Sequence, residues 1–505
     1  MLNQYLKKIL SARVYDVAIE SPLHQAPFLS ERLGNHIWVK REDEQPVYSF
    51  KIRGAYNKVV QLSEEEKARG VVAASAGNHA QGLALAAKEL GIKATIVMPR
   101  TTPEIKVKSV KARGAKVVLH GDAFDEAFAY SQKLVEEKGM TYIHPYDDPE
   151  TIAGQGTIGM EILRQMRDPV DAIFVPVGGG GLIAGVAAYV KSLRPEVRIV
   201  GVESSESASL AAALEAGERV ILPQVGIFAD GVAVAQVGEN TWEVCKDHVD
   251  EVITVTPDEI CAAVKDTFDD TRAVCEPAGA LSVAGLKKYV EREGCENQHL
   301  IAILSGANVN FDRLRYISEV AEIGEGREVI LAVTIPEQPG SFQKFCSLLG
   351  KRPITEFNYR YGDDNRAQIY VGVKVSAEPG AQQALLDELI AHDYPVTDLT
   401  HNEIAKYHIR HMVGGHAPVS VADEHLYRFE FPERPGALLN FLRTLGKRFN
   451  ISLFHYRNHG AAYGRVLVGL QVPEGKEAEL RKYLKALGYR YWDETDNTAY
   501  HLFLR

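Results

Sequence analysis

Short apolar runs alternate with helical stretches along residues 37–310. Eight runs read as strands, and between most of them apolar residues recur with the spacing of one helix face. This alternation is typical of an α/β fold in which helices cover both faces of a mostly parallel sheet, and ligands bind beyond the carboxyl ends of its strands. The expected strands are 37–42, 70–75, 93–99, 115–121, 141–146, 171–177, 198–204 and 299–306.

From about residue 327 the pattern changes and then repeats. The segment EVILAVTIPEQPGSFQKFCSLLG, which starts at Glu328, resembles HLYRFEFPERPGALLNFLRTLG, which starts at His425. Further on, FNYR at 357–360 resembles FHYR at 454–457. Both copies read as strand, helix, strand, strand, helix, strand, the order of the ferredoxin-like βαββαβ unit. The sequence therefore predicts an internal duplication.

The chain of 505 residues is long enough for about three domains. We expect a large α/β domain at 1–326, the first small copy at 327–400, an irregular connection at 401–423 and the second copy at 424–496. No apolar stretch after the amphipathic N-terminus could serve as a signal or membrane span, so we expect a cytoplasmic protein without a membrane partner.

Composition excludes some classes of function. The net charge of −10, without a dense basic run, argues against a nucleic-acid partner. The five cysteines are scattered and form no CxxC or Cys/His cluster, so neither a disulfide framework nor a metal site is indicated.

The sequence SFKIRG at 49–54 places a lysine in an unusual position. Ser49 is a good N-cap residue, and helical spacing follows, so Lys51 is expected in the first turn of a helix. There the helix dipole and the apolar neighbours both lower the pKa of an ammonium group. Such a lysine is a candidate nucleophile that can form a Schiff base. A lone lysine is more often solvated, so other motifs must decide.

Two turns after expected strands can bind anions. SAGNHAQG at 75–82 offers backbone N–H groups at a helix start, although Ser75 or Asn78 as an ordinary cap is the commoner case. VGGGGLIAG at 177–185 can close its N–H groups around a phosphate. It also fits G-x-G-x-x-A, and Glu203 ends the next strand, so NAD is an equal alternative for this segment alone. No G-K-[ST] follows, which excludes a P-loop.

A third turn completes a set. LSGANVN at 304–310 places Ser305 at the carboxyl end of a strand, although a simple turn serine is commoner. Together the motifs indicate a pyridoxal phosphate site. Lys51 can form the Schiff base, Gly178–Gly181 can hold the phosphate, Asn78 can bond the ring hydroxyl and Ser305 the ring nitrogen. An NAD enzyme needs neither the buried lysine nor the upstream anion-binding turn.

The motifs SFKIRGA, SAGNHAQG, VGGGGL, CEPAGA and LSGANVNFDRLRY resemble those of the serine/threonine dehydratases. That resemblance implies an α/β, tryptophan-synthase-β-like (fold type II) pyridoxal phosphate catalytic domain at 1–326. The duplicated tail resembles the tandem ACT-like regulatory domains of the biosynthetic threonine deaminases. The resemblance covers Tyr15 to Trp492. It implies the Schiff base at Lys51, cofactor contacts at Asn78, Gly178, Gly179, Gly180, Gly181, Leu182 and Ser305, and substrate carboxylate binding at Ser75, Gly77 and Asn78.

The resemblance also implies a reaction and its control. It implies conversion of L-threonine to 2-oxobutanoate and ammonia with pyridoxal 5'-phosphate, the first step of isoleucine biosynthesis, in a homotetramer inhibited by isoleucine and opposed by valine. L-Serine dehydration with an amino-acid-sensing tail is the alternative, because one methyl group is worth only about 1–3 kcal/mol of discrimination. A pure amino-acid sensor would not need the cofactor motifs. The expected effector neighbourhoods are Pro339–Phe342, Pro435–Leu438, Tyr359 and Tyr456.

Overall fold

The computed structural model divides the chain into two compact units, Met1–Ala321 and Glu322–Arg505. The domain boundaries expected from the sequence remain predictions. The structure describes all residues except 227, 339, 351, 361–365, 377, 379, 403–404, 406–408, 412–420, 422, 433–436, 446–448, 458–462 and 505.

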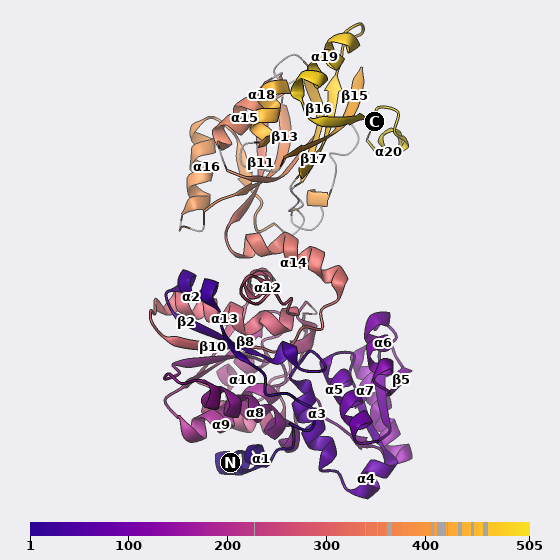
Figure 1. The fold of residues 1–505 in the computed structure, drawn as a ribbon, viewed down its shortest axis with the longest axis vertical. Helices are drawn as coiled ribbons and strands as arrows, with labels where there is room; N and C mark the ends of the chain where they lie inside the picture. The colour runs from indigo at the N-terminus through magenta and orange to yellow at the C-terminus, as the bar shows by residue number, and fades with distance from the viewer. Residues whose placement is uncertain are drawn as a thin grey trace. The chain divides into compact units, whose positions relative to one another are not determined.

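The first unit is built on two sheets instead of the single sheet expected from the sequence (Figure 1). The larger sheet is parallel except for its first strand, which is antiparallel to the second. Two of its strands, the first and the last in the sheet, were not anticipated from the sequence. Its order is β1 (Leu23–Gln25), β2 (His36–Arg41), β10 (His299–Leu304), β7 (Ala172–Pro176), β8 (Arg198–Ser204) and β9 (Glu251–Val255).

Alternate residues of these strands face two helical layers, as the pleat of a strand requires. Ile173 and Val175 pack in one core with α8 (Pro149–Gln165) and α9 (Gly181–Leu193). Phe174 points the other way and meets Tyr289 of α13 (Pro277–Glu293), with ring centroids 5.2 Å apart.

The smaller sheet is entirely parallel. Its order is β5 (Lys116–Leu119), β4 (Ala94–Met98), β3 (Val71–Ala74) and β6 (Thr141–Tyr142). Helices α5 (Asn78–Glu89) and α6 (Glu104–Ala112) share a core with one face, and α7 (Phe124–Lys138) packs on the other. Further helices of this unit are α1 (Leu2–Leu10), α2 (Pro27–Leu33), α4 (Glu64–Arg69), α10 (Ser209–Ala216), α11 (Glu239–His248), α12 (Pro257–Thr271) and the 3-10 turns η1 (Glu42–Glu44) and η2 (Asp230–Val232).

Helix α3 (Lys51–Val60) packs against both α5 and α8, and thereby joins the two sheets. Its crossing with α8 is very close: a Cβ atom on Gly154 would lie 2.7 Å from the Arg53 carbonyl oxygen. The glycine therefore permits the approach that fixes the start of α3. On the α5 side, a Cβ atom on Gly82 would lie 3.1 Å from the Lys51 backbone.

A network of buried charges anchors the same end of α3. Arg53 donates to Glu42 at 2.7 Å and to Glu161 at 2.6 Å, and Lys40 donates to Glu161 at 2.6 Å. All four side chains are fully buried. Two cations against two carboxylates leave the cluster neutral, which is the condition for keeping charges in an interior.

The second unit contains one antiparallel sheet of eight strands formed by both copies. The copies join where Asn358 pairs with His455. The predicted βαββαβ order is confirmed in each. The first has β11 (Glu328–Pro336), α15 (Ser341–Leu349), β12 (Ile354–Arg360), β13 (Arg366–Lys374), α16 (Ala381–Ala391) and β14 (Val396–Asp398); the second has β15 (Glu424–Pro432), α18 (Ala437–Leu445), β16 (Asn450–Arg457), β17 (Tyr463–Gln471), α19 (Glu477–Leu487) and β18 (Arg490–Asp493).

The four helices of the copies lie on one face of this sheet (Figure 1) and share its main core. On the other face, buried glutamates occupy matching places in the two copies. Thr355 donates to Glu328 in the first copy, and Ser452 donates to Glu424 in the second. Arg360 of the first copy also pairs with Glu424, so this ion pair ties the copies together.

Part of the expected connection at 401–423 packs on the first copy. Arg410, in η3 (Ile409–His411), is buried and donates to Glu356 at 2.9 Å. Two more helices of the described residues are α14 (Phe311–Gly324) and α20 (Thr498–Phe503). In the parts of the chain that the structure describes, no helix is long and apolar enough to cross a membrane, and no group of His, Cys, Asp and Glu could hold a metal ion.

Candidate functional site

Lys51 is the first residue of α3, and its side chain is partly buried. The helix cap is Phe50 and makes no side-chain cap bond; Ser49, the expected cap, instead pairs with Gly306 in an isolated bridge. Lys51 Nζ donates to the Pro145 carbonyl at 2.9 Å. Burial lowers the pKa of Lys51 to about 8, while nearby Glu276 opposes the shift. A pKa of about 8 leaves a far larger neutral fraction near physiological pH than an ordinary lysine has, which suits a nucleophile or a base.

The glycine turn lies beside the loop that accepts the Lys51 hydrogen bond. The ring of Tyr146, next to Pro145, covers Gly179 so closely that a Cβ atom there would lie 2.3 Å from it. Thr241 Oγ1 donates to the Gly179 carbonyl at 2.8 Å. The contacts with Tyr146 and Thr241 hold the turn in place, and the Tyr146 ring leaves no room for a side chain at position 179.

This turn fits a phosphate group. Helix α9 begins at Gly181, and its cap, Gly180, has no side chain that could accept the first N–H groups. Gly180 has φ +90°, a conformation that favours glycine, and a Cβ atom on it would lie 2.9 Å from Thr241. Leu182 is buried in the first turn. N–H groups at the positive end of a helix form an anion site, which pyridoxal phosphate requires.

The second predicted anion turn adopts a related geometry. Helix α5 begins at Asn78, and its cap is Gly77 instead of Ser75 or Asn78. Ser75 Oγ accepts a hydrogen bond from the Gly77 N–H at 3.3 Å. A Cβ atom on Gly77 would meet no atom within 4 Å, so the turn borders open space that a small carboxylate can enter.

Ser305 and Asn78 converge on the start of α13. Ser305 is buried, and its Oγ donates to the Ala278 carbonyl at 3.2 Å, a long bond for a hydroxyl. Asn78 Nδ2 donates to Glu276, and Asn78 Oδ1 accepts from Asn308 Nδ2 at 2.7 Å. The structure thus brings turns from both sheets to one place. Sequence reasoning recognised the motifs that hold Glu276 and Asn308 but assigned them no role, and it missed Tyr146.

The acidic residue that supported the NAD alternative has another use. Glu203 is fully buried, and its carboxylate accepts the N–H groups of Leu210 and Ala211 at 2.8 and 2.9 Å. It therefore caps α10 and cannot reach a ribose. Burial raises the pKa of Glu203 to about 7.

His79, next to Asn78, predicts a pH dependence of stability. Burial lowers the pKa of His79 to about 3, and nearby Lys51 adds to the shift. The unfolded chain takes up this proton near pH 6.5, so the residue's stabilising contribution is present above pH 6.5 and is lost as pH falls toward 3. We expect His79→Gln, whose amide can still donate to the Ile143 carbonyl, to flatten the fall of melting temperature between pH 6.5 and 4. Parallel curves for both proteins would contradict this.

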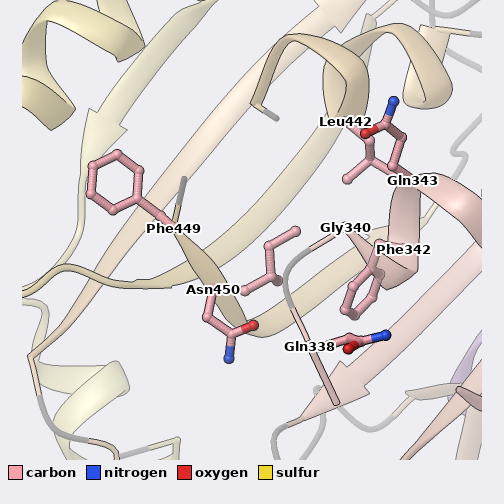
Figure 2. Close-up of a pocket in the computed structure, with 8 residues that line it drawn as sticks. Gln338, Gly340, Phe342, Gln343, Leu442, Phe449 and Asn450 are labelled. Carbon is pink, nitrogen blue, oxygen red and sulfur yellow. The ribbon is translucent and has the colours of Figure 1, made fainter. Parts of the chain in front are cut away.

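The second unit has a small cavity between its two copies. It is lined by the start of α15, by Leu442 of α18 and by the start of β16 (Figure 2). Its space of about 10 Å³ is that of about one water molecule. The lining residues are Gln338, Gly340, Phe342, Gln343, Leu442, Phe449, Asn450 and Ile451. Of the predicted effector neighbourhoods, Pro339 and the turn at 433–436 lie outside the described residues.

Comparison with known families agrees with the division of the chain into the units Met1–Ala321 and Glu322–Arg505. A family described as pyridoxal-phosphate dependent enzyme matches residues 14–306, and one described as the C-terminal regulatory domain of threonine dehydratase matches residues 319–409 and again 415–504. The chain belongs to the threonine dehydratase family. It is therefore a pyridoxal-phosphate-dependent lyase with a duplicated regulatory region.

Similar proteins support the family over the full length. The L-threonine dehydratase biosynthetic IlvA of Burkholderia multivorans is 56% identical over 505 residues, 99% of each chain. A solved structure of the processed form of threonine deaminase isoform 2 from Solanum lycopersicum is 52% identical, with TM-score 0.63, over 64% of this chain and 88% of that one. Maize serine racemase is 34% identical, with TM-score 0.59, over 62% of this chain and 95% of that one. A dehydratase family member thus shares its catalytic fold with a racemase.

Proposed function

We propose that this protein converts L-threonine to 2-oxobutanoate and ammonia, and that this is the first step of isoleucine biosynthesis. The observation that carries the proposal is one set of residues for pyridoxal phosphate in a chain whose tail matches the regulatory domain of threonine dehydratase. The racemase likeness makes the tail important, because the catalytic fold by itself supports more than one reaction.

Each residue has a defined task in this proposal. The N–H groups from Gly178 through Leu182 hold the phosphate, Asn78 bonds the ring hydroxyl and Lys51 holds the aldehyde carbon. The turn of Ser75 and Gly77 binds the substrate carboxylate. When bound, the cofactor supplies the electron sink that stabilises negative charge at the substrate α-carbon.

Lys51 is the proposed base. With threonine bound, the neutral Nζ of Lys51 would take the α-proton, because burial disfavours the charged form. The α-proton and the β-hydroxyl together make one water, and the released enamine tautomerises to the imine, which water hydrolyses to 2-oxobutanoate and ammonia. Elimination is favoured if the Ser305 hydroxyl donates a hydrogen bond to the ring nitrogen, because the nitrogen then stays uncharged. The long bond to Ala278 is easily exchanged for one to the ring.

A turnover assay tests the substrate. We expect formation of 2-oxobutanoate from threonine, and slower formation of pyruvate from serine, because the methyl group contributes only about 1–3 kcal/mol of selectivity. Preference for serine would favour the alternative, a serine dehydratase with an amino-acid-sensing tail. Turnover of neither amino acid would contradict the proposal.

We propose isoleucine as an inhibitor, opposed by valine, in a cytoplasmic homotetramer. The cavity in the second unit supports a site for a small amino acid. Backbone N–H groups at the start of α15 suit its carboxylate, and Phe342 and Leu442 suit an aliphatic side chain. Glu337, which accepts a hydrogen bond from Tyr359 at 2.5 Å, supplies negative charge near Phe342 for the ammonium group.

The cavity is too small for isoleucine as it stands, so binding must move the side chains that line it. Such a ligand binds an opened arrangement better than a closed one, and this difference in affinity is what shifts a conformational equilibrium. The coupling between threonine and isoleucine binding must then be reciprocal, with a typical size of about 1–3 kcal/mol.

A chain ending at Gly326 should retain the cofactor residues and turn over threonine without inhibition by isoleucine. The full-length protein assayed in parallel is the control, and a mass measurement of both shows whether the assembly has changed. Inhibition of the shortened protein at low isoleucine concentration would place the effector site in the first unit.

A further inference from the structure

The motif CEPAGA at 275–280 and Asn308 have no task in the function proposed above. In the structure they meet at Asn78 through a chain of hydrogen bonds. Asn308 Nδ2 donates to the Val47 carbonyl at 2.8 Å and to Asn78 Oδ1 at 2.7 Å. Asn78 Nδ2 in turn donates to Glu276 Oε1. The chain therefore begins at a backbone carbonyl and ends at a buried carboxyl group.

The hydrogen bonds from Glu276 to Val47 can run in only one donor-to-acceptor direction. A backbone carbonyl can only accept, so Asn308 must turn its Nδ2 group toward Val47 and its second N–H toward Asn78. Asn78 must then present Oδ1 to Asn308 and Nδ2 to Glu276. The reversed amide would bring two NH₂ groups face to face and set an amide oxygen against a carboxylate oxygen.

The backbone around Glu276 is shaped to bring this side chain to Asn78. A Cβ atom on Gly306 would lie 2.4 Å from Glu276 Oε1, and one on Gly279 would lie 2.0 Å from the Gly306 carbonyl oxygen. Only glycines permit this approach of the two motifs. Glu276 stands at the cap position of α13 but makes no cap bond to the helix. Its side chain is buried, and burial raises the pKa of Glu276 to about 7.

We propose that Glu276 and Asn308 are positioning residues that hold the Asn78 amide with its Nδ2 group ready to donate to the ring hydroxyl of pyridoxal phosphate. This inference rests on the role of Asn78 in the proposed function. Nδ2 carries two hydrogens, of which Glu276 takes one, and the other serves the ring oxygen. The reversed amide would offer that oxygen only lone pairs, which it could bond only by donating its own proton.

The sharpest test reverses the direction of these hydrogen bonds with a substitution that keeps the size of the side chain. Asn308→Asp replaces two N–H donors with acceptors, so Asn78 must turn its Nδ2 group toward the new carboxylate. We expect the dissociation constant of pyridoxal phosphate, titrated by its visible absorbance, to rise about tenfold, the loss of about one hydrogen bond. Glu276→Ala should act similarly. Glu276→Gln keeps an accepting oxygen and should remain within about threefold of the unchanged protein.

Controls separate positioning from general damage. Ser282→Ala removes another buried hydrogen bond from α13, to the Ile303 carbonyl at 2.7 Å, and should leave cofactor affinity unchanged. In an Asn78→Ala background, Asn308→Asp should change cofactor affinity less than twofold, because no amide remains to be oriented. A full tenfold change there, or none in the single variants while Asn78→Ala weakens binding, would overturn the inference. Normal affinity in Asn78→Ala itself would instead overturn the proposed role of Asn78.

Discussion

Lys51→Ala should lower threonine turnover by at least about 10²–10⁴-fold, the contribution of a positioned base alone, while the protein remains folded. No other side chain replaces it in the proposal, because Lys51 both holds the cofactor and takes the α-proton. The visible absorbance of the lysine-bound cofactor should disappear as well. Turnover and the absorption spectrum of the purified variant measure both effects.

Two controls sharpen this result. Lys67→Ala removes a lysine from α4 whose partner, Glu64, is exposed, and should leave turnover unchanged. Lys51→Arg keeps a cation that cannot become neutral, so it should be as inactive as the alanine variant. Turnover by Lys51→Ala near the rate of the unchanged protein would show that the assignment of the base and Schiff-base residue is wrong.

Glu161→Ala should destabilise the first unit by about 3–5 kcal/mol, because it leaves Lys40 and half of the Arg53 contacts without their buried carboxylate. The melting temperature of the cofactor-bound protein should fall by roughly 5–15 °C. Arg53 is two residues from Lys51, so cofactor release at temperatures below melting should also become faster.

The matched control is Glu64→Ala, which breaks an exposed pair with Lys67 and should change the melting temperature by less than about 2 °C. The double variant Lys40→Met/Glu161→Gln removes one charge of each sign and leaves Arg53 with Glu42. It should recover part of the lost stability. A melting temperature of Glu161→Ala equal to that of the control would show that the network contributes little.

Much of the fold was readable because it depends on local patterns. All eight strands expected in the first unit are present, and both βαββαβ copies follow the predicted order. The glycine turn and Lys51 were readable for the same reason: four glycines and a lysine at a helix start are unusual whatever surrounds them. The strands β1 and β9 were missed: both are edge strands, β1 has only three residues, and Glu251 and Thr254 interrupt the apolar residues of β9.

The sequence by itself determined the elements, the duplication and the residue types of the proposed cofactor site, because spacing and backbone freedom are properties of neighbouring residues. Tertiary structure alone decided that the strands form two sheets and that α3 joins them. It alone decided that Glu203 caps a helix and that Glu276 and Asn308 meet Asn78. Those contacts join residues far apart in the chain, and packing at distances set by Gly154, Gly279 and Gly306 creates them. A glycine permits another backbone segment to pack closely against it, but no local sequence pattern specifies which distant segment that is.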